Sequence, residues 1–404
     1  MLICTNIQAK LKEQIIEHAS KRTVTALGLA GYVLIGTVAV LIPAVMPSIT
    51  DEFAAAGLSL AAIGLIFPAR SIGGILGNLL AGVGSDRLGR QRMVWLAALL
   101  VSVALGLTAW ATPWLLFLAA LAAVNLTQAA LSTGINALVA DANRASRSRA
   151  LNTLHGVYGA GAAISPLLIG YLLEGGLPWR WAVGGAGLLW LLYGLLFLML
   201  AGNGNDEKEE AGAQKLDWSM LRDGPFLALF FIAFSYNGVA YSLLGWIAVF
   251  MQRSAGFSIF ASVSMISVFY VALTTGRFLC AAFSEKIGYA KTLLILGIGI
   301  TLTYPLVIFG STWLVVAGVF LTGLSLSGLF PTALAFGARH YDAQTGALTG
   351  TLNVAMTLGA MIPPLWTGMI ADAWSFQGAL GVNYVLVVPL IFIAVYLSRV
   401  EMHQ

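Results

Sequence analysis

Charged side chains are scarce in this chain of 404 residues. Asp, Glu, Lys and Arg make up only 9% of it, against about 25% in soluble proteins. Hydrophobic residues make up 59%. Because so few charges cannot cover the surface of a soluble globule, the composition excludes a water-soluble enzyme and predicts that lipid surrounds most of the chain.

Cysteine and catalytic motifs are scarce as well. Cys4 and Cys280 are the only cysteines, and their separation fits no disulfide framework, zinc site or redox motif. The apolar segments contain no H-E-x-x-H, paired carboxylates or nucleophile triad, so we expect neither an enzyme nor a bound metal or cofactor. The 21 Lys and Arg residues form no basic domain, which excludes nucleic acid as a partner.

Long apolar runs are abundant. A helix needs about 20 apolar residues to cross the hydrocarbon core of a bilayer. The runs of this length lie near residues 24–47, 58–83, 92–111, 114–140, 149–173, 179–201, 225–251, 257–283, 290–310, 312–338, 344–371 and 377–398. The runs predict an all-α membrane protein with twelve transmembrane helices. Together with the polar segment and the repeat described below, they predict a fold class of twelve transmembrane helices in two pseudo-symmetric six-helix bundles.

One polar segment divides the predicted spans into six and six. It is rich in charge and glycine and has no apolar periodicity, which is typical of a solvated linker. The predicted parts are an N-terminal segment (1–23), a first bundle (24–201), the linker (202–224), a second bundle (225–398) and a tail (399–404). The N-terminal segment lacks the features of a signal peptide, and we expect an interfacial amphipathic helix there, with a disordered tail as the alternative.

Basic residues predict the orientation of the chain. If the N-terminus is cytoplasmic, seventeen of the 21 Lys and Arg residues lie on the cytoplasmic side, as the positive-inside rule expects. Only Arg180 and Arg253 fall in the opposite loops. We therefore expect both termini in the cytoplasm, and the short loops fit a bacterial inner membrane. Membrane lipid is an expected partner, and we expect a monomer.

The two halves of the chain repeat in parallel. The octet SDRLGRQR, Ser85–Arg92, resembles SEKIGYAK, Ser284–Lys291, 199 positions later. Both octets lie between the second and third spans of their half. Further matches are Pro166 with Pro364 and Gly170 with Gly368. Transporters are often built from such repeats, with the solute site near the middle of the bilayer where the halves meet.

The first octet extends to GVGSDRLGRQR, which resembles the signature loop of the major facilitator superfamily. The resemblance includes the twelve spans and the linker, and it implies two bundles that rock around a central solute site in alternating access. The conformational-switch residues it implies are Gly82, Asp86, Arg87, Gly89 and Arg90. Asp86 could pair with arginines of the loop or meet the N-terminus of a helix. Anchoring of the loop by its positive charges is the alternative interpretation.

Two arginines lie within predicted spans, where a charge is costly and therefore a candidate for function. Arg70 lies deep in the second span, and its charge needs a partner, which a bound anion or backbone carbonyls could supply. Arg277, in the eighth span, corresponds to Asn78 in the repeat. Several facilitator families, including sugar and monocarboxylate transporters, carry a similar arginine. Both arginines are candidate solute-binding residues, with structural hydrogen bonding as the alternative.

His155 is the only histidine within a span, and the repeat superposes it on Asn353. Both side chains could hydrogen-bond a solute, and His155 could also carry a coupling proton because it titrates near neutral pH. A structural histidine is the alternative. The remaining solute-binding candidates are the amides Asn125, Gln128, Asn136 and Asn237 and the aromatics Tyr158, Tyr241, Tyr270 and Trp366. Amides and flat rings suit a hydroxyl-rich solute such as a sugar, whereas lipid-facing positions would also explain the rings.

Three transport functions remain open. Segments such as LNTLHGVYGAGAAISP resemble the fucose permease branch of the superfamily and imply a carbohydrate-like solute. That branch carries a carboxylate where this chain has Ser132, so proton symport would need His155, and uniport or exchange stay open. The second function is transport or exchange of an organic anion by Arg70 and Arg277. The third is efflux of lipophilic compounds, because the segment from Ser165 partly resembles an exporter signature.

Overall fold

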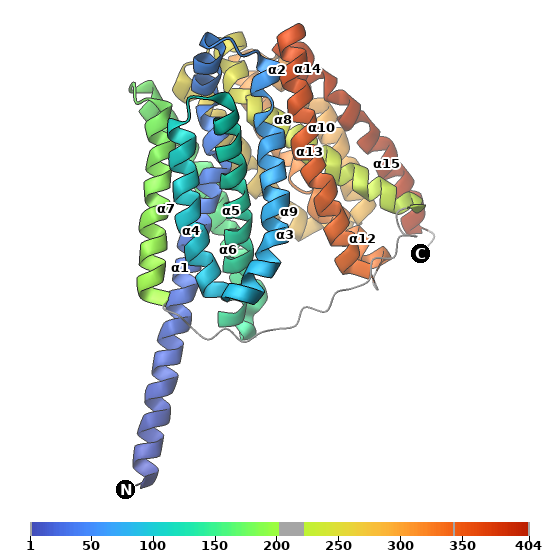
Figure 1. The fold of residues 1–404 in the computed structure, drawn as a ribbon. Helices are drawn as coiled ribbons and strands as arrows, with labels where there is room; N and C mark the ends of the chain where they lie inside the picture. Colours follow the sequence, from blue (N-terminus) through green and yellow to red (C-terminus); the bar gives the residue numbers. More distant parts are fainter. Residues whose placement is uncertain (1, 202–221, 342–343, 403–404) are drawn as a thin grey trace. The chain divides into compact units, whose positions relative to one another are not determined.

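The computed structural model describes residues 2–201, 222–341 and 344–402, with the backbone alone for residues 2–20, 82–83, 85–87, 148 and 201. Every element in these ranges is a helix (Figure 1). They supply twelve membrane-spanning helices by length and hydropathy, which confirms the predicted all-α membrane protein with twelve spans.

The spans follow the chain. In order they are α1 (Leu2–Ala55), α2 and α3 (Leu60–Ile63, Ile66–Leu88), α4 (Arg90–Trp110), α5 (Trp114–Ala142), α6 (Arg147–Glu174), α7 (Trp179–Ala201), α8 (Gly224–Ala255), α9 (Ile259–Ile287), α10 (Tyr289–Phe309), α11 and α12 (Thr312–Leu326, Leu329–His340), α13 (Thr345–Ala373), and α14 and α15 (Phe376–Val382, Tyr384–Met402). A short 3-10 helix, η1 (Arg144–Ser146), precedes α6.

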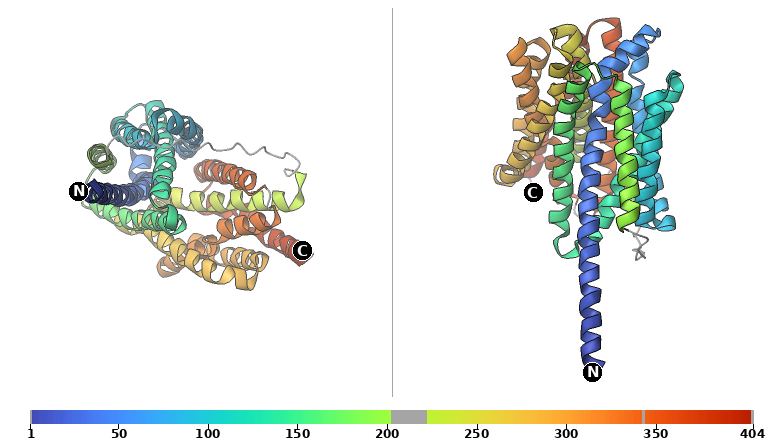
Figure 2. Two further views of the ribbon diagram at one scale, coloured as in Figure 1. Left: turned by 90° about the horizontal axis from the view of Figure 1, so that it is seen from below. Right: turned by 90° about the vertical axis from the view of Figure 1, so that its left-hand side faces the viewer.

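The first helix differs from its prediction. The sequence separates an interfacial helix from a first span that begins at residue 24, but α1 is one helix of 54 residues without a break at that point. Figure 2 shows the same helix running on to the N-terminus. A helix lying in the plane of the membrane would have to bend before the first span, and α1 has no such bend.

Three spans predicted as single helices are broken. The second is interrupted at Gly64, the tenth at Gly328 and the twelfth at Asn383. At Gly328 the packing is close, because a Cβ there would overlap the Cys280 side chain of α9. At Asn383 the side chain bonds two other helices instead of facing lipid, and such polar partners are what make a helix break tolerable in a membrane.

Contacts divide the chain into two compact units. Unit 1 contains residues 1–39, 72–162 and 180–209, and unit 2 contains residues 40–71, 163–179 and 210–404. Within unit 1, α4 packs along α5, and within unit 2, α8 packs along α13. The unit boundaries cut through α1, α3 and α6, so the division into two six-helix bundles stays a prediction.

The repeat in the sequence is also a repeat in packing. In unit 1, Gly161 of α6 lies so close to the carbonyl of Val33 on α1 that a Cβ would overlap it. In unit 2, Gly359 of α13 meets the carbonyl of Phe234 on α8 in the same way. The two glycines are 198 positions apart. In each half, therefore, a glycine lets the corresponding spans pack closely. These are the first and fifth spans in the first half and the seventh and eleventh spans in the second half.

Helix ends repeat as well. The Asn143 side chain at the end of α5 donates to Thr25 Oγ1 at 2.8 Å, and the Tyr341 hydroxyl at the end of α12 donates to Asp223. Both partners in the second half stand 198 positions after those in the first. Gly89 and Gly288, the glycines of the matched octets, begin α4 and α10 with φ of +82° and +96°, a conformation that favours glycine.

Candidate functional site

A polar cluster lies in unit 1, between α1, α5 and α6. The hydroxyl of the buried Tyr32 on α1 is 3.0 Å from Ser132 Oγ on α5, and the Asn136 amide is within hydrogen-bond range of the same hydroxyl. The ring of His155 on α6 stands edge-on to Tyr32, with ring centroids 5.7 Å apart. Three helices thus bring a phenol, a hydroxyl, an amide and an imidazole together.

One face of α5 carries most of the polar groups of this cluster. Asn125, Gln128, Ser132 and Asn136 follow one another at spacings of three and four, which puts them on the same side of the helix. The Asn125 amide donates to Leu121 O of its own helix at 3.0 Å. Gln128 Nε2 and Asn136 Oδ1 are buried and have no hydrogen-bond partner among the described residues. Buried polar atoms are nearly always paired in proteins, so these two atoms on one helix face are unusual.

A second polar cluster lies in unit 2. Arg277 Nη2 on α9 donates to the Tyr236 hydroxyl on α8 at 3.2 Å. The Tyr236 ring stacks on Phe330 of α12, with centroids 6.2 Å apart and planes at 21°. Tyr241 lies five residues after Tyr236 on α8 and interacts electrostatically with Arg70 of α3. This cluster combines cationic groups with flat phenol and phenyl faces.

Two predicted solute-binding residues join helices. Asn237 Nδ2 on α8 donates to the carbonyl of Met356 on α13 at 2.9 Å. Trp366 Nε1 on α13 donates to Asn383 Oδ1 at 2.9 Å, and Asn383 Nδ2 donates to the Tyr304 hydroxyl at 3.2 Å. These N–H groups are used between helices, and a role of Asn237 and Trp366 in solute binding stays a prediction.

The other predicted residues are spread over the helices. Tyr158 is half-buried on α6, one turn after His155. Tyr270 on α9 is half-buried and stands edge-on to the adjacent Phe269. Asn353 is exposed on α13. None of these placements tests a role in solute binding.

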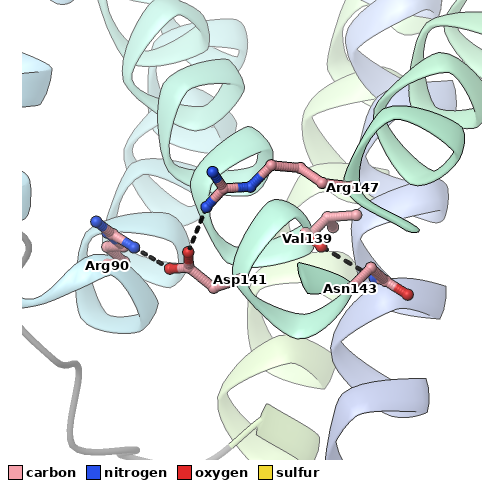
Figure 3. A network of polar contacts seen from close by, with 5 residues as sticks. All are labelled: Arg90, Val139, Asp141, Asn143 and Arg147. Atoms are coloured by element: carbon pink, nitrogen blue, oxygen red, sulfur yellow. Dashed lines mark hydrogen bonds and ion pairs between the residues drawn. The ribbon is translucent and has the colours of Figure 1, made fainter. Parts of the chain in front are cut away.

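The predicted conformational switch is described in part. Arg90, at the start of α4, pairs with Asp141 at the end of α5. Arg147, at the start of α6, reaches the other oxygen of the same carboxylate at 3.3 Å (Figure 3). Asp141 therefore lies between two arginines from different helices. The side chains of Asp86 and Arg87, and the surroundings of Gly82, lie outside the described residues.

Three residues that contribute to these clusters were not predicted from the sequence. They are Tyr32, Phe330 and Asp141. Tyr32 and Phe330 look like ordinary apolar members of their spans, and no periodicity separates them from lipid-facing rings. Asp141 had a usable signal, because it is an acid at the end of a span followed closely by Arg144 and Arg147. No group of three His, Cys, Asp or Glu side chains that could hold a metal occurs in the described part of the chain.

Comparisons with known proteins agree with the fold. The family described as the Major Facilitator Superfamily matches residues 28–305 and, in a second match, residues 261–404. The hexuronate transporter of Bacillus subtilis strain 168 is 25% identical over 363 residues, which cover 82% of this chain and 84% of that protein. The glucose/mannose transporter GlcP of the same strain is 23% identical over 339 residues, with 81% and 84% covered.

The fold also matches solved structures. A crystal structure of a bacterial homolog of the human lysosomal transporter Spinster, in an inward-facing and unoccupied conformation, gives a TM-score of 0.78 at 16% identity, with 94% of this chain and 97% of that chain covered. At this identity the likeness concerns the fold alone. The family match extends over nearly the whole chain. The chain therefore belongs to the Major Facilitator Superfamily, and it is a multi-pass membrane transporter of the secondary type rather than an enzyme.

Proposed function

We propose that the protein moves a small polar organic solute, carbohydrate-like in its chemistry, across the membrane by alternating access. The observation that carries this proposal is the pair of buried, unpartnered amide atoms on α5, Gln128 Nε2 and Asn136 Oδ1. One is a donor and the other an acceptor, and they lie about two turns apart on α5. Separate hydroxyl groups of one solute can satisfy them in a state of the transporter in which both atoms are accessible.

The neighbours of these amides support the same solute class. Tyr32 and Ser132 add hydroxyl groups that can donate and accept hydrogen bonds, and His155 adds a flat imidazole ring. A sugar ring presents hydroxyl groups around its rim and C–H groups on its faces, so it suits a cluster of neutral polar groups and rings. The similarity to a glucose/mannose transporter is in keeping with this solute class. Membership of the fucose permease branch stays a prediction.

An organic anion is the second candidate, and one observation favours it. Arg277 is exposed on α9 and donates to the hydroxyl of Tyr236. A guanidinium has five N–H donors in a fork that matches a carboxylate, so Arg277 suits a solute with a carboxylate group. A sugar acid would combine both candidates, and one relative is a hexuronate transporter.

His155 is the proposed site for a coupling proton. It is exposed on α6 and contacts the ring of Tyr32, whose hydroxyl bonds Ser132. A change of charge on the imidazole would be felt directly by this cluster. We further propose a monomer in a bacterial inner membrane, with both termini in the cytoplasm as the distribution of Lys and Arg predicts.

The test is a thermal-shift screen of the purified protein against glucose, mannose, hexuronates, dicarboxylates and inorganic phosphate. A solute that binds the folded protein raises its melting temperature with increasing concentration. We expect a shift with a sugar or sugar acid that is lost in Asn136→Ala and Gln128→Ala. Thr127→Val is the matched control, since this α5 hydroxyl bonds its own helix.

The same screen separates the two candidates. If a neutral sugar gives the shift and Arg277→Gln retains it, the solute is carbohydrate-like. If only carboxylates give a shift and Arg277→Gln abolishes it, the anion candidate replaces the first. A shift that Asn136→Ala and Gln128→Ala leave intact would contradict the proposed site.

A further inference from the structure

A set of acidic side chains lies where several spans of unit 2 end or begin. We call this region the far end, and it comprises the ends of α1, α6, α8 and α13 and the starts of α2 and α9. All of these belong to unit 2, so their contacts are those of one compact body. The proposed solute site uses none of these acids.

Two of the carboxylates bind backbone N–H groups at the start of a span from the other half of the chain. Glu174, at the end of α6 in the fifth span, accepts from Phe260 N in the first turn of α9 at 2.6 Å. Asp372, near the end of α13 in the eleventh span, accepts from Leu60 N at the start of the second span at 3.2 Å. The fifth span is thereby tied to the eighth, and the eleventh to the second.

The two bonds are copies of each other. Glu174 and Asp372 are 198 positions apart, and Leu60 and Phe260 are 200 positions apart. The serines that precede the receiving helices also match, because Ser59 accepts from Ala62 N at 3.2 Å and Ser258 accepts from Ala261 N at 3.3 Å. The receiving turns are therefore built alike, and each holds its own serine cap as well as a carboxylate from the opposite half.

A third acid completes the set. Asp51, at the end of the first span, pairs with Arg253 at the end of the seventh at 2.7 Å. The two spans hold corresponding places in the two halves. Every one of the three interactions therefore connects a span of the first six with a span of the second six.

Each of these contacts is weak by itself, and their effect depends on there being three of them. An exposed ion pair alone contributes little. Glu174 gains a modest attraction from the dipole of the long helix α9, whereas Asp372 bonds a free N–H group at the start of the four-residue helix α2. Three contacts that all join the same two halves act together, because separating the halves at this end breaks all three.

We propose that Glu174, Asp372 and Asp51 form an outer clasp that holds the far ends of the two halves together and sets the balance between the two states of the transporter. The proposal rests on the proposed function insofar as it assumes alternating access. Without the clasp, the far end opens more often, and with the predicted topology this is the end that faces away from the cytoplasm.

The test measures the distance between two nitroxide labels by pulsed electron paramagnetic resonance, without any solute. The labels replace Ala56 and Ala255, which lie in the turns after α1 and at the end of α8 and are exposed, in a chain whose native cysteines are changed to serine. Glu174→Gln, Asp372→Asn and the double variant keep the side-chain shape and remove the charge. Glu52→Gln is the matched control, because Glu52 accepts from Trp179 Nε1 of its own half at 2.7 Å.

We expect each single variant to add a population at longer distance and the double variant to enlarge it several-fold, while Glu52→Gln leaves the distribution as in the parent. An unchanged distribution in the double variant, or an equal change in Glu52→Gln, would overturn the clasp. Where the double variant fails to give a monodisperse sample, a single variant that is monodisperse and has the same distance distribution as the parent protein also overturns the clasp. A protein that binds no solute but shows the distance change would refute the proposed function and leave the clasp standing.

Discussion

Asn237 and Met356 join the seventh and eleventh spans by a side-chain bond at the place where the first half of the chain uses a glycine. Asn237 Nδ2 donates to Met356 O at 2.9 Å. In the first half the corresponding carbonyl, that of Tyr158, meets Gly36, where a Cβ would overlap it. Met356 stands 198 positions after Tyr158, and Asn237 stands 201 after Gly36. At corresponding places, the first half therefore uses a close glycine contact and the second half uses a side-chain hydrogen bond.

The Asn237 bond predicts a measurable stability term. Hydrogen bonds between membrane helices contribute about 0.6 kcal/mol on average and up to about 1.7 kcal/mol. We expect Asn237→Ala to lower the free energy of unfolding in bicelles by an amount in this range, measured by steric trapping. Thr367→Val on α13 is the control, since its hydroxyl bonds Pro363 O of the same helix. Equal losses in both variants would contradict the assignment.

Two neighbouring glycines of α3 should respond in opposite ways. A Cβ on Gly73 would overlap the carbonyl of Ala122 on α5, whereas a Cβ on Gly74 meets nothing. We expect Gly73→Ala to destabilise the protein by about 1–3 kcal/mol through overpacking and Gly74→Ala to be neutral or to stabilise it by up to about 1 kcal/mol. Melting curves in detergent test this, and similar melting temperatures for the two variants would show that the helices do not approach as described.

The two arginines around Asp141 should couple to it unequally. The Arg90 side chain is 18% exposed, whereas that of Arg147 is 50% exposed and its contact is 3.3 Å long. In double-mutant cycles with alanine we expect a coupling of about 1 kcal/mol between Arg90 and Asp141 and below about 0.5 kcal/mol between Arg147 and Asp141. A larger coupling for Arg147 would reverse this ranking and reject the pairing in Figure 3.

Alkaline pH should weaken the end of α12. Burial, and to a lesser degree its bond to the Asp223 carboxylate, raises the pKa of Tyr341 above the ordinary value of 10.0. The folded chain therefore holds the phenol proton more tightly than the unfolded chain, and the stability this contributes is present below pH 10 and lost as the pH rises above it. We expect melting temperatures to fall more steeply above pH 10 in the parent than in Tyr341→Phe. Parallel curves would contradict this.

The sequence was sufficient for the spans, because hydropathy and length alone decide whether a helix can cross lipid. It also predicted the parallel repeat, which the packing at Gly161 and Gly359 follows. It did not predict the breaks at Gly328 and Asn383, where the chain contacts side chains of other helices, Cys280 in one case and Trp366 in the other.

The candidate site was harder to predict for the same reason. Asn136 and Asn237 are both amides within spans, and composition cannot tell them apart. One has a buried oxygen without a described partner, and the other is bonded to a neighbouring helix. The difference depends on which face each amide occupies and on what packs there, which are properties of the tertiary structure. Tyr32 was missed because only its contacts with Ser132 and His155 distinguish it from a lipid-facing ring.

Solute counterflow in proteoliposomes tests the central claim most directly. Vesicles loaded with an unlabelled sugar or sugar acid are diluted into its labelled form, and a carrier that alternates its access accumulates label transiently. We expect this overshoot with the parent protein and with Thr127→Val, and at least a tenfold lower initial rate with Asn136→Ala. If no labelled sugar or sugar acid accumulates and the protein instead transports a lipophilic dye, the account is contradicted.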